Sequence, residues 1–220
     1  MTERLNNVSV VKPIVIGTYA FLLQQGASDK AASMYRWTVC LRSAEDPHED
    51  LSYYIRNVEF TLHNTFTQPR RTIDHPPYEV TEVGWGEFEI NVKVFFHDSQ
   101  ERSVELRHFL KLRPDHELAS QPGFNQTITP VVKETYEQII FQNPHEWFYE
   151  KLIRPPNGHL PPSPLEPFFG TFEDEQEFEE LTEIHHFLRR QIAMQSEALM
   201  LADNEYRAQK ELMNRSANAV

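Results

Sequence analysis

Cysteine is nearly absent from the sequence, and long hydrophobic runs are absent altogether. The 220 residues include one cysteine, Cys40, so an intramolecular disulfide is excluded and a reducing compartment, the cytosol or the nucleus, is expected. No apolar run approaches the ~20 residues that a helix needs to cross a bilayer. The first residues, MTERLNNVSVVKP, have no signal-peptide core, so we predict a chain that is not secreted and has no membrane contact.

Positive charge is also scarce. The chain has 21 lysines and arginines against 33 aspartates and glutamates, which gives a net charge of -12 at pH 7. This balance argues against a protein that binds nucleic acid or an anionic membrane, and it permits a basic partner such as a cationic peptide tail. Apolar residues make up 40% of the chain, which is enough to bury a core.

The common catalytic signatures are missing as well. The sequence contains no GxSxG or HExxH motif, no glycine-rich phosphate loop and no CxxC pair. His185 and His186 are adjacent, so their side chains would diverge on a helix, and no metal site is indicated there. A deacylase with His63 as its base would need an orienting acid that the residues around His63 do not supply. We therefore predict no enzymatic activity, no metal and no cofactor.

Short segments with alternating apolar residues occupy the chain up to about residue 141. Phe88, Ile90, Val92 and Val94, for example, can face one side of a strand while the residues between them face the other. Without a helical pattern among them, such segments indicate an antiparallel β-sandwich, with residues 115–133 as a long loop. The predicted strands are 8–18, 36–42, 55–63, 78–84, 88–96, 103–112 and 135–141.

A short helix and a proline-rich segment follow the predicted strands. Asn143 and Pro144 suggest the helix start, with Asn143 as the cap and Pro144 in the first turn. The apolar face of this helix would consist of Trp147, Phe148, Leu152 and Ile153. Residues 154–172 contain six prolines, at 155, 156, 161, 162, 164 and 167, so we predict an extended linker between a domain at 1–153 and the rest of the chain.

Helical periodicity marks the C-terminal segment, residues 173–214. Its a positions are Phe178, His185, Ile192, Leu199, Tyr206 and Met213, and its d positions are Leu181, Leu188, Gln195, Ala202 and Gln209. This 4-3 spacing predicts an α-helical coiled coil, formed with a partner or with a second copy of the chain. The alternative is a single amphipathic helix packed against the β domain.

Aromatic residues cluster beside turn residues in two motifs, HNTF at 63–66 and GWGEF at 84–88. If both strand ends open onto one tip of a sandwich, Phe66, Trp85, Thr65 and His63 come together there. Two rings, a hydroxyl and free backbone amides suit a flat, neutral amide group, whereas the carboxylate that an ammonium group would require is lacking. The glycines would permit unusual backbone geometry and leave room for a ligand. The alternative is that Phe66, Phe88 and Trp85 are core residues and the glycines ordinary turn residues.

Three stretches, LHNTF, PPYEVTEVGWGEFEINVKVFF and IIFQNPHEWFYEKL, resemble the YEATS-domain family, whose members read acylated lysine on histone tails. The layout, with a C-terminal coiled coil, resembles the branch found in chromatin-remodelling and histone-acetyltransferase complexes. The resemblance implies an immunoglobulin-like sandwich, a nuclear location, and partners that include an acylated histone tail and other complex subunits. A structural scaffold subunit with a vestigial pocket is the alternative.

The resemblance also implies a role for each residue of the tip. Phe66 and Trp85 would sandwich an acyl-lysine side chain, Thr65 would bond its amide, and the Trp85 backbone N–H would bond its carbonyl. His63 would orient the pocket, and Gly84, Gly86 and Phe88 would shape its floor. An open end would accept crotonyl as well as acetyl groups.

Two features depart from the family pattern. Where members often carry a histidine or phenylalanine that closes the channel, this chain has Met34 and Tyr35, either of which could take that place. Where some members carry acidic residues that hold the histone tail, this chain has Arg102, Arg107 and His108.

Overall fold

The computed structural model describes residues 3–24, 33–156 and 158–172, and in the C-terminal part residues 184–185, 187–192, 194–196 and 199–200. The chain divides into two compact units, Met1–Phe172 and Glu173–Val220. Among the described residues, no helix is both long and apolar enough to span a membrane.

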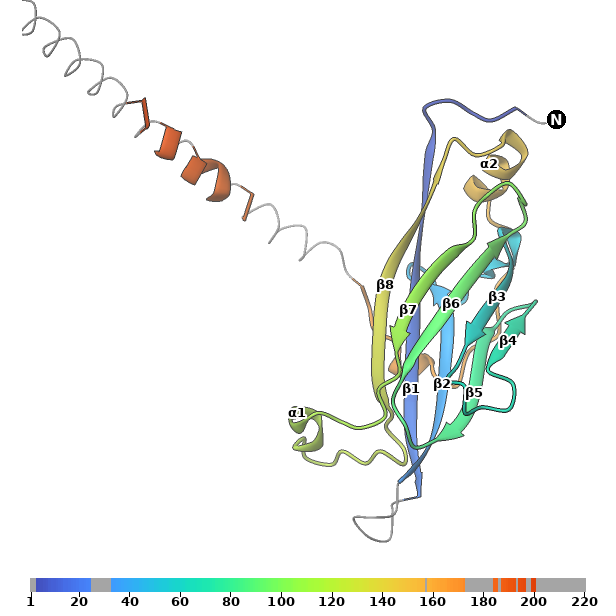
Figure 1. The fold of residues 1–220 in the computed structure, drawn as a ribbon, viewed down its shortest axis with the longest axis vertical. Coiled ribbons are helices and arrows are strands. Elements are labelled where there is room, and N and C mark those ends of the chain that lie inside the picture. The colour runs from blue at the N-terminus through green and yellow to red at the C-terminus, as the bar shows by residue number, and fades with distance from the viewer. Residues whose placement is uncertain are drawn as a thin grey trace, which may run out of the picture. The chain divides into compact units, whose positions relative to one another are not determined.

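The first unit is a sandwich of two four-stranded antiparallel sheets (Figure 1). One sheet has the order β5 (Tyr78–Gly84), β2 (Met34–Ser43), β1 (Ser9–Gln24) and β8 (Val131–Gln142). The other has the order β4 (Arg70–Ile73), β3 (Ile55–Thr61), β6 (Glu89–Phe96) and β7 (Val104–Phe109). Short helical elements complete the unit: η1 (Leu51–Tyr53), α1 (His116–Ala119), α2 (Glu146–Ile153) and η2 (Glu166–Phe168).

The predicted sandwich is confirmed, and each of the seven predicted strands is present. The expectation of a loop over 115–133 is wrong at two places, because α1 forms at His116–Ala119 and β8 begins at Val131. Strand β4 was not predicted, since the sequence RRTI shows no apolar alternation. It forms because its backbone pairs with β3, and because Arg71 forms an ion pair with Glu82 of the other sheet at 2.6 Å.

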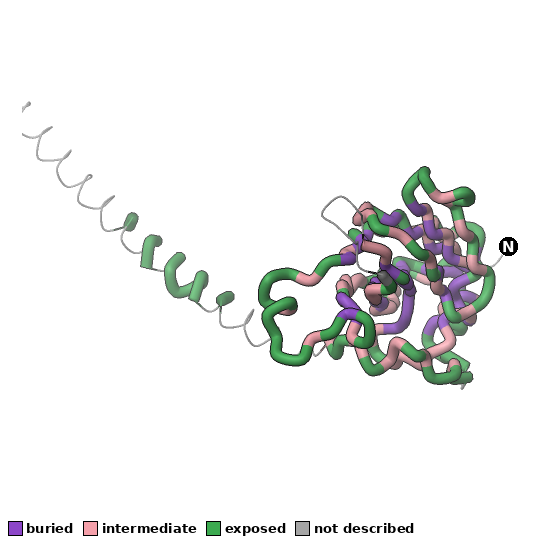
Figure 2. The backbone as a smooth tube through the Cα atoms, turned by 90° about the horizontal axis from the view of Figure 1, so that it is seen from below, coloured by how far each residue is buried: buried purple, intermediate pink, exposed green. Residues whose placement is uncertain are grey.

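The core lies between the sheets and follows the alternation seen in the sequence. Ile90, Val92 and Val94 of β6 are fully buried, as are Val58 and Phe60 of β3. Burial of such side chains is the main favourable term in folding, at roughly 25 cal/mol per Å² of apolar surface. Figure 2 shows the buried stretches of backbone enclosed by exposed loops.

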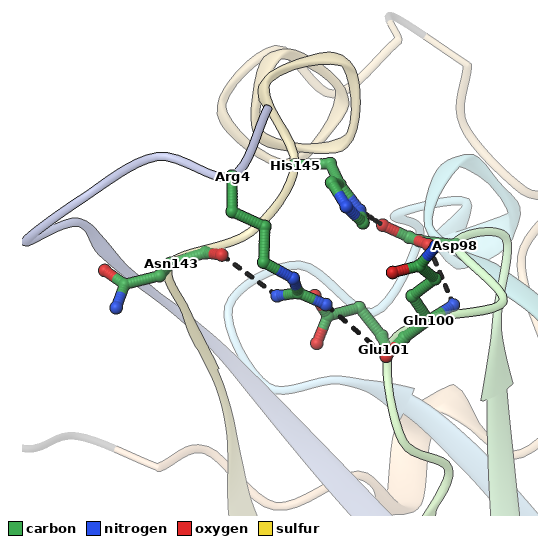
Figure 3. A network of polar contacts seen from close by, with 6 residues as sticks. All are labelled: Arg4, Asp98, Gln100, Glu101, Asn143 and His145. Atoms are coloured by element: carbon green, nitrogen blue, oxygen red, sulfur yellow. Dashed lines mark hydrogen bonds and ion pairs between the residues drawn. The ribbon is translucent and has the colours of Figure 1, made fainter. Parts of the chain in front are cut away.

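A polar network joins the N-terminal segment to the β6–β7 turn and the start of α2 (Figure 3). Asp98 and His145 form a buried pair at 2.5 Å. Arg4 bonds the carboxylate of Glu101 at 2.9 Å and the backbone carbonyl of Asn143 at 3.0 Å. These contacts tie segments that are about a hundred residues apart in the sequence to one end of the sandwich.

The start of α2 differs from the prediction. His145, and not Asn143, is the N-cap residue, and the helix begins at Glu146, beyond Pro144. Asn143 instead takes a left-handed conformation with φ of 50°, and its side-chain oxygen accepts a bond from the Val8 backbone N–H at 3.2 Å. The capping prediction is wrong because the Asn143 side chain bonds Val8, the residue before β1, instead of the first turn of α2.

Helix α2 packs mainly through two of its four predicted apolar residues. Phe148 and Leu152 are fully buried, and Trp147 packs against the core. Ile153, by contrast, remains exposed.

Residues 158–172, which we call the strap, pack against the outer face of the first sheet. The sequence predicts a linker here, but these residues belong to the first compact unit. Gly170 donates its N–H to Glu134 at 2.8 Å, and its carbonyl accepts a bond from Arg42 at 3.1 Å. Arg42 and Glu134 also pair with each other at 2.9 Å, with 7% of each side chain exposed.

Aromatic side chains reinforce this attachment. The Phe169 ring lies 4.5 Å from the Arg42 guanidinium and 5.6 Å from the ring of Tyr19. Phe172 packs against Tyr136 of β8 at 5.6 Å. Proline rules out a regular helix or central strand in this segment, but the aromatic residues beside the prolines still hold it on the sheet.

The second unit is helical wherever the structure describes it, between Ile184 and Met200. Leu188, Ile192 and Leu199, at predicted a and d positions, are more than half exposed. Other predicted seam positions, namely Phe178, Leu181, Ala202, Tyr206, Gln209 and Met213, lie outside the described residues. The coiled coil therefore stays a prediction.

The buried Arg42–Glu134 pair yields the first testable prediction. A Glu134→Gln change leaves the buried Arg42 cation without its counter-charge, so we expect the free energy of unfolding of the full chain to fall by roughly 3 kcal/mol. Urea denaturation followed by circular dichroism measures this loss.

The matched control is Glu105→Gln, at an exposed carboxylate that pairs with Lys93, where we expect a change below about 0.5 kcal/mol. Equal small effects in both variants would contradict the claim that the buried Arg42–Glu134 pair stabilises the sandwich.

Candidate functional site

An open hollow lies at the end of the sandwich where β5 ends and β2 begins. Its volume is about 680 Å³. All seven residues that the sequence predicts for the site line this hollow: His63, Thr65, Phe66, Gly84, Trp85, Gly86 and Phe88. The other lining residues are Met34, Thr67, Glu82, Val83 and Glu87.

A tight loop between β3 and β4 presents His63, Thr65 and Phe66. The backbone N–H of Leu62 donates to the carbonyl of Pro69 at 2.8 Å, which closes the loop at its base. Within it, the N–H of Phe66 donates to the His63 carbonyl at 3.1 Å. Hydrogen bonds within the backbone thus hold the HNTF motif in one conformation.

The hydroxyl of Thr65 is oriented by His63. Its oxygen lies 3.0 Å from His63 Nδ1, and the backbone N–H of Thr65 donates to the same nitrogen at 3.4 Å. Because that nitrogen acts as the acceptor, the hydroxyl donates its proton to it. The Thr65 oxygen therefore keeps its lone pairs free to accept a bond from a ligand N–H.

The rings on the floor of the hollow rest on Trp37, which is fully buried in the core. Phe66 and Phe88 each meet Trp37 edge to face, with ring centroids 5.9 and 5.8 Å apart. The Phe88 ring also lies 5.8 Å from the rings of Phe66 and His63. Edge-to-face contacts of this kind stabilise a fixed arrangement beyond the area that they bury.

Trp85 differs from these rings because it is 60% exposed. It is the first residue after β5, on the wall of the hollow. The alternative that Trp85 is a core tryptophan is wrong, since Trp37 holds that position. Phe66 and Phe88 fit both alternatives, core residue and site residue, because they pack against the core and also line the hollow.

The two glycines leave space without an unusual backbone. Neither Gly84 nor Gly86 has a positive φ, so the expectation of special backbone geometry is wrong at both positions. A Cβ atom at Gly84 would lie 3.5 Å from Trp37 Nε1 and 3.8 Å from the tip of the Phe66 ring. A side chain there would therefore occupy the space beside the rings.

Two carboxylates line the hollow, although the sequence analysis expects none. Glu82 forms its ion pair with Arg71 at 2.6 Å. One oxygen of Glu87 accepts bonds from the backbone N–H groups of Leu112 and Arg113, at 2.8 and 3.0 Å. Both carboxylates are thus occupied by contacts within the protein.

The structure decides between the two residues that could close the channel. Met34, at the start of β2, lines the hollow. Tyr35 points the other way and is 6% exposed, as part of the core. Of these two residues, Met34 is therefore the one whose side chain borders the hollow.

The basic residues noted above as a departure from the family pattern lie apart from the hollow. Arg102 lines a separate depression with Arg4 and Ile140. Arg107 is exposed, and its side chain lies 3.9 Å from Glu89. His108 is buried and cannot contact a partner, because its ring bridges the two sheets between the hydroxyls of Thr18 and Thr135 at 3.1 Å each.

Comparison with known proteins places these observations in a family. The YEATS family matches residues 32–114, a range that includes both motifs of the hollow. The "Protein AF-9 homolog" of Kluyveromyces lactis is 36% identical over 84% of this chain and 86% of its own length. The chain belongs to the YEATS family.

Two further relatives are similar. The "Protein AF-9 homolog" of Emericella nidulans is 40% identical over 69% of this chain, which spans 55% of that relative. The "Transcription initiation factor TFIID subunit 14b" of Arabidopsis thaliana is 36% identical over 74% of this chain and 62% of its own length.

Solved YEATS structures share the fold. "Crystal structure of the Yaf9 YEATS domain bound to H3K27ac" describes a chain that is 33% identical, with a TM-score of 0.54 over 68% of this chain and 97% of that one. "The Yaf9 YEATS domain Recognizing H3K122suc Peptide" matches at 33% identity with a TM-score of 0.53 over the same shares. The two-sheet sandwich is thus the immunoglobulin-like fold of a family of binding domains, and no enzyme family is indicated.

Burial of His108 generates the second prediction. Burial, together with the nearby Lys133 cation, lowers the pKa of His108 from 6.5 to about 4. The unfolded chain therefore binds a proton near pH 6.5 that the folded chain does not bind until about pH 4. The contribution of neutral His108 to the free energy of unfolding is fully present above pH 6.5. This contribution, on the order of 3 kcal/mol, is lost as the pH falls toward 4.

Urea unfolding of the wild type and of His108→Asn at several pH values between 4 and 7.5 tests this expectation. The variant should be less stable near neutral pH and lose less stability on acidification. Identical pH dependence in both proteins would contradict the assignment of a neutral, buried His108.

Proposed function

We propose that this protein reads acylated lysine on histone tails, as a nuclear subunit of a chromatin-remodelling or histone-acetyltransferase complex. The observation that carries this proposal is the exposed Trp85 ring on a hollow whose floor is the Trp37-supported Phe66 ring. An exposed ring leaves apolar surface in contact with water. A ligand that stacks on the ring removes that surface from water, which favours binding. The solved relatives described with H3K27ac and H3K122suc support the same ligand class.

The polar groups of the hollow suit the amide of an acylated lysine. Thr65 presents an acceptor oxygen, since its proton is donated to His63. That oxygen would accept the amide N–H of the ligand, and the backbone N–H of Trp85 would donate to the acyl carbonyl. Phe66 and Trp85 would hold the flat amide between them, with Phe88, Gly84 and Gly86 shaping the space below.

The open shape of the hollow favours more than one acyl group. Its volume is about 680 Å³, and Met34 provides a flexible apolar wall. We therefore propose that crotonyl groups bind as well as acetyl groups, because a flat unsaturated chain stacks well on aromatic rings.

Membership of a complex would rest on the C-terminal helix. Its exposed Leu188, Ile192 and Leu199 provide an apolar face that a partner helix can cover. The partner would be another subunit or a second copy of this chain. The name of the Arabidopsis relative, a subunit of a transcription factor complex, supports this role. The alternative function is a scaffold subunit whose pocket is vestigial.

Peptide titration tests the reader function and gives the third prediction. The full chain is titrated with one histone-tail peptide in unmodified, acetylated, crotonylated and trimethylated forms. We expect binding that depends on the acyl group, weakened at least about tenfold by Trp85→Ala or Phe66→Ala, because each change removes one stacking ring.

Phe109→Ala is the matched control, since Phe109 is an exposed aromatic residue of β7 outside the hollow. Equal binding of all four peptide forms would contradict the proposal. If no form binds while the chain still assembles with its partner subunits, the scaffold function replaces the reader function.

A further inference from the structure

A second cavity, with a volume of about 230 Å³, lies beneath the strap. It borders the start of β5, whereas the hollow borders the end of the same strand. Three segments enclose it: residues 40–51, residues 76–79 and the strap. Its lining includes six prolines, three leucines and the rings of Tyr78 and Phe169, so most of its surface is apolar. The reader function makes no use of this cavity.

The strap is held in place on both sides of the cavity. Before it, the Leu160 backbone N–H donates to the His48 carbonyl at 2.8 Å. After it, the Gly170 N–H donates to Glu134 at 2.8 Å. Residues 161–164, between these two contacts, line the cavity. The cavity is therefore a built feature of the folded domain.

One guanidinium and two carboxylates lie along the lining. The Arg42 guanidinium pairs with Glu134 of β8 at 2.9 Å, and β8 is at the edge of the sheet opposite β5. Its charge is thus balanced on the side away from β5. Glu49 accepts a bond from the Tyr53 hydroxyl at 2.8 Å, which satisfies one carboxylate oxygen and brings no positive charge.

Glu79 is the second carboxylate, and it is partly buried on β5 opposite Cys40 of β2. Within the described part of the chain, no hydrogen bond or ion pair joins its side chain to another residue. Burial raises the pKa of Glu79, because the ionised carboxylate loses hydration. A cation that enters the cavity would replace that lost hydration with an ion pair.

We propose that this cavity binds a small organic ammonium ion, whose charged group pairs with Glu79 and whose apolar body packs against the prolines, Tyr78 and Phe169. The two aromatic rings can also attract a cation through their faces. Apolar cavities of ~150 Å³ hold a single six-membered ring, so about 230 Å³ leaves room for a ring that carries an aminomethyl group. The site is separate from the hollow and does not depend on the reader function.

NMR titration of the full chain with benzylammonium tests the proposal, and benzyl alcohol is the uncharged control of similar shape. We expect benzylammonium to shift the backbone amide signals of Cys40, Glu79 and Leu160, with a Kd at or below about 1 mM. Benzyl alcohol should bind at least about fivefold more weakly, because it packs the same ring but forms no ion pair.

A Glu79→Gln change keeps the size of the side chain and removes its charge. We expect benzylammonium to lose at least about fivefold in affinity in this variant, with little change for benzyl alcohol. Glu105→Gln, at an exposed carboxylate of β7 outside the cavity, is the matched control and should leave both affinities unchanged.

A capped lysine peptide is titrated in parallel, since it carries the same ammonium group on a peptide chain. We expect it to bind more weakly than benzylammonium, because the strap covers the cavity and restricts entry of a chain. Tighter binding of the peptide would assign the cavity to a lysine side chain of a partner protein and overturn the small-molecule site.

Two other results would also overturn the proposal. Unchanged signals around the cavity up to about 10 mM benzylammonium would show that it holds no such ligand. Equal affinities for benzylammonium and benzyl alcohol, or an unchanged ratio in Glu79→Gln, would show that the carboxylate does not recognise the ligand.

Discussion

The packing of Phe66 and Phe88 against Trp37 is the contact on which the site depends. Trp37 is fully buried between the sheets, so the two phenylalanine rings that meet its faces and edges cannot shift independently of the core. The register of β2 and β5 pairs Tyr35 with Gly84, which places Met34 and Trp85 at the same rim. The core therefore positions the Phe66 and Phe88 rings of the hollow, whereas Trp85 is 60% exposed.

The same register explains why alternate residues of one strand serve the core and the site. Tyr35 and Trp37 point inward, and Met34 lies at the open end of β2. Because Met34 does not belong to the core, a change of residue at the rim leaves the packing of Tyr35 and Trp37 unchanged.

Much of this could be predicted from the sequence, because it depends on local patterns. Alternation along β3 and β6 and the turn residues around HNTF and GWGEF predict both the sandwich and the grouping of the site. The rest depends on contacts between distant residues. The position of Asn143 is set by Val8, that of β4 by its pairing with β3, and the docking of the strap by Arg42 and Glu134. Nor does any local pattern show that Glu87 faces the hollow.

The most direct test of the account follows the backbone amide signals of the full chain by NMR while a crotonylated histone-tail peptide is added. The account predicts that the largest shifts fall on residues 63–66 and 84–88 and on the indole N–H of Trp85. Residues of the strap and of the Asp98–His145 network should change little. Large shifts confined to those regions, with none at the two motifs, would contradict the claim that the hollow is the binding site.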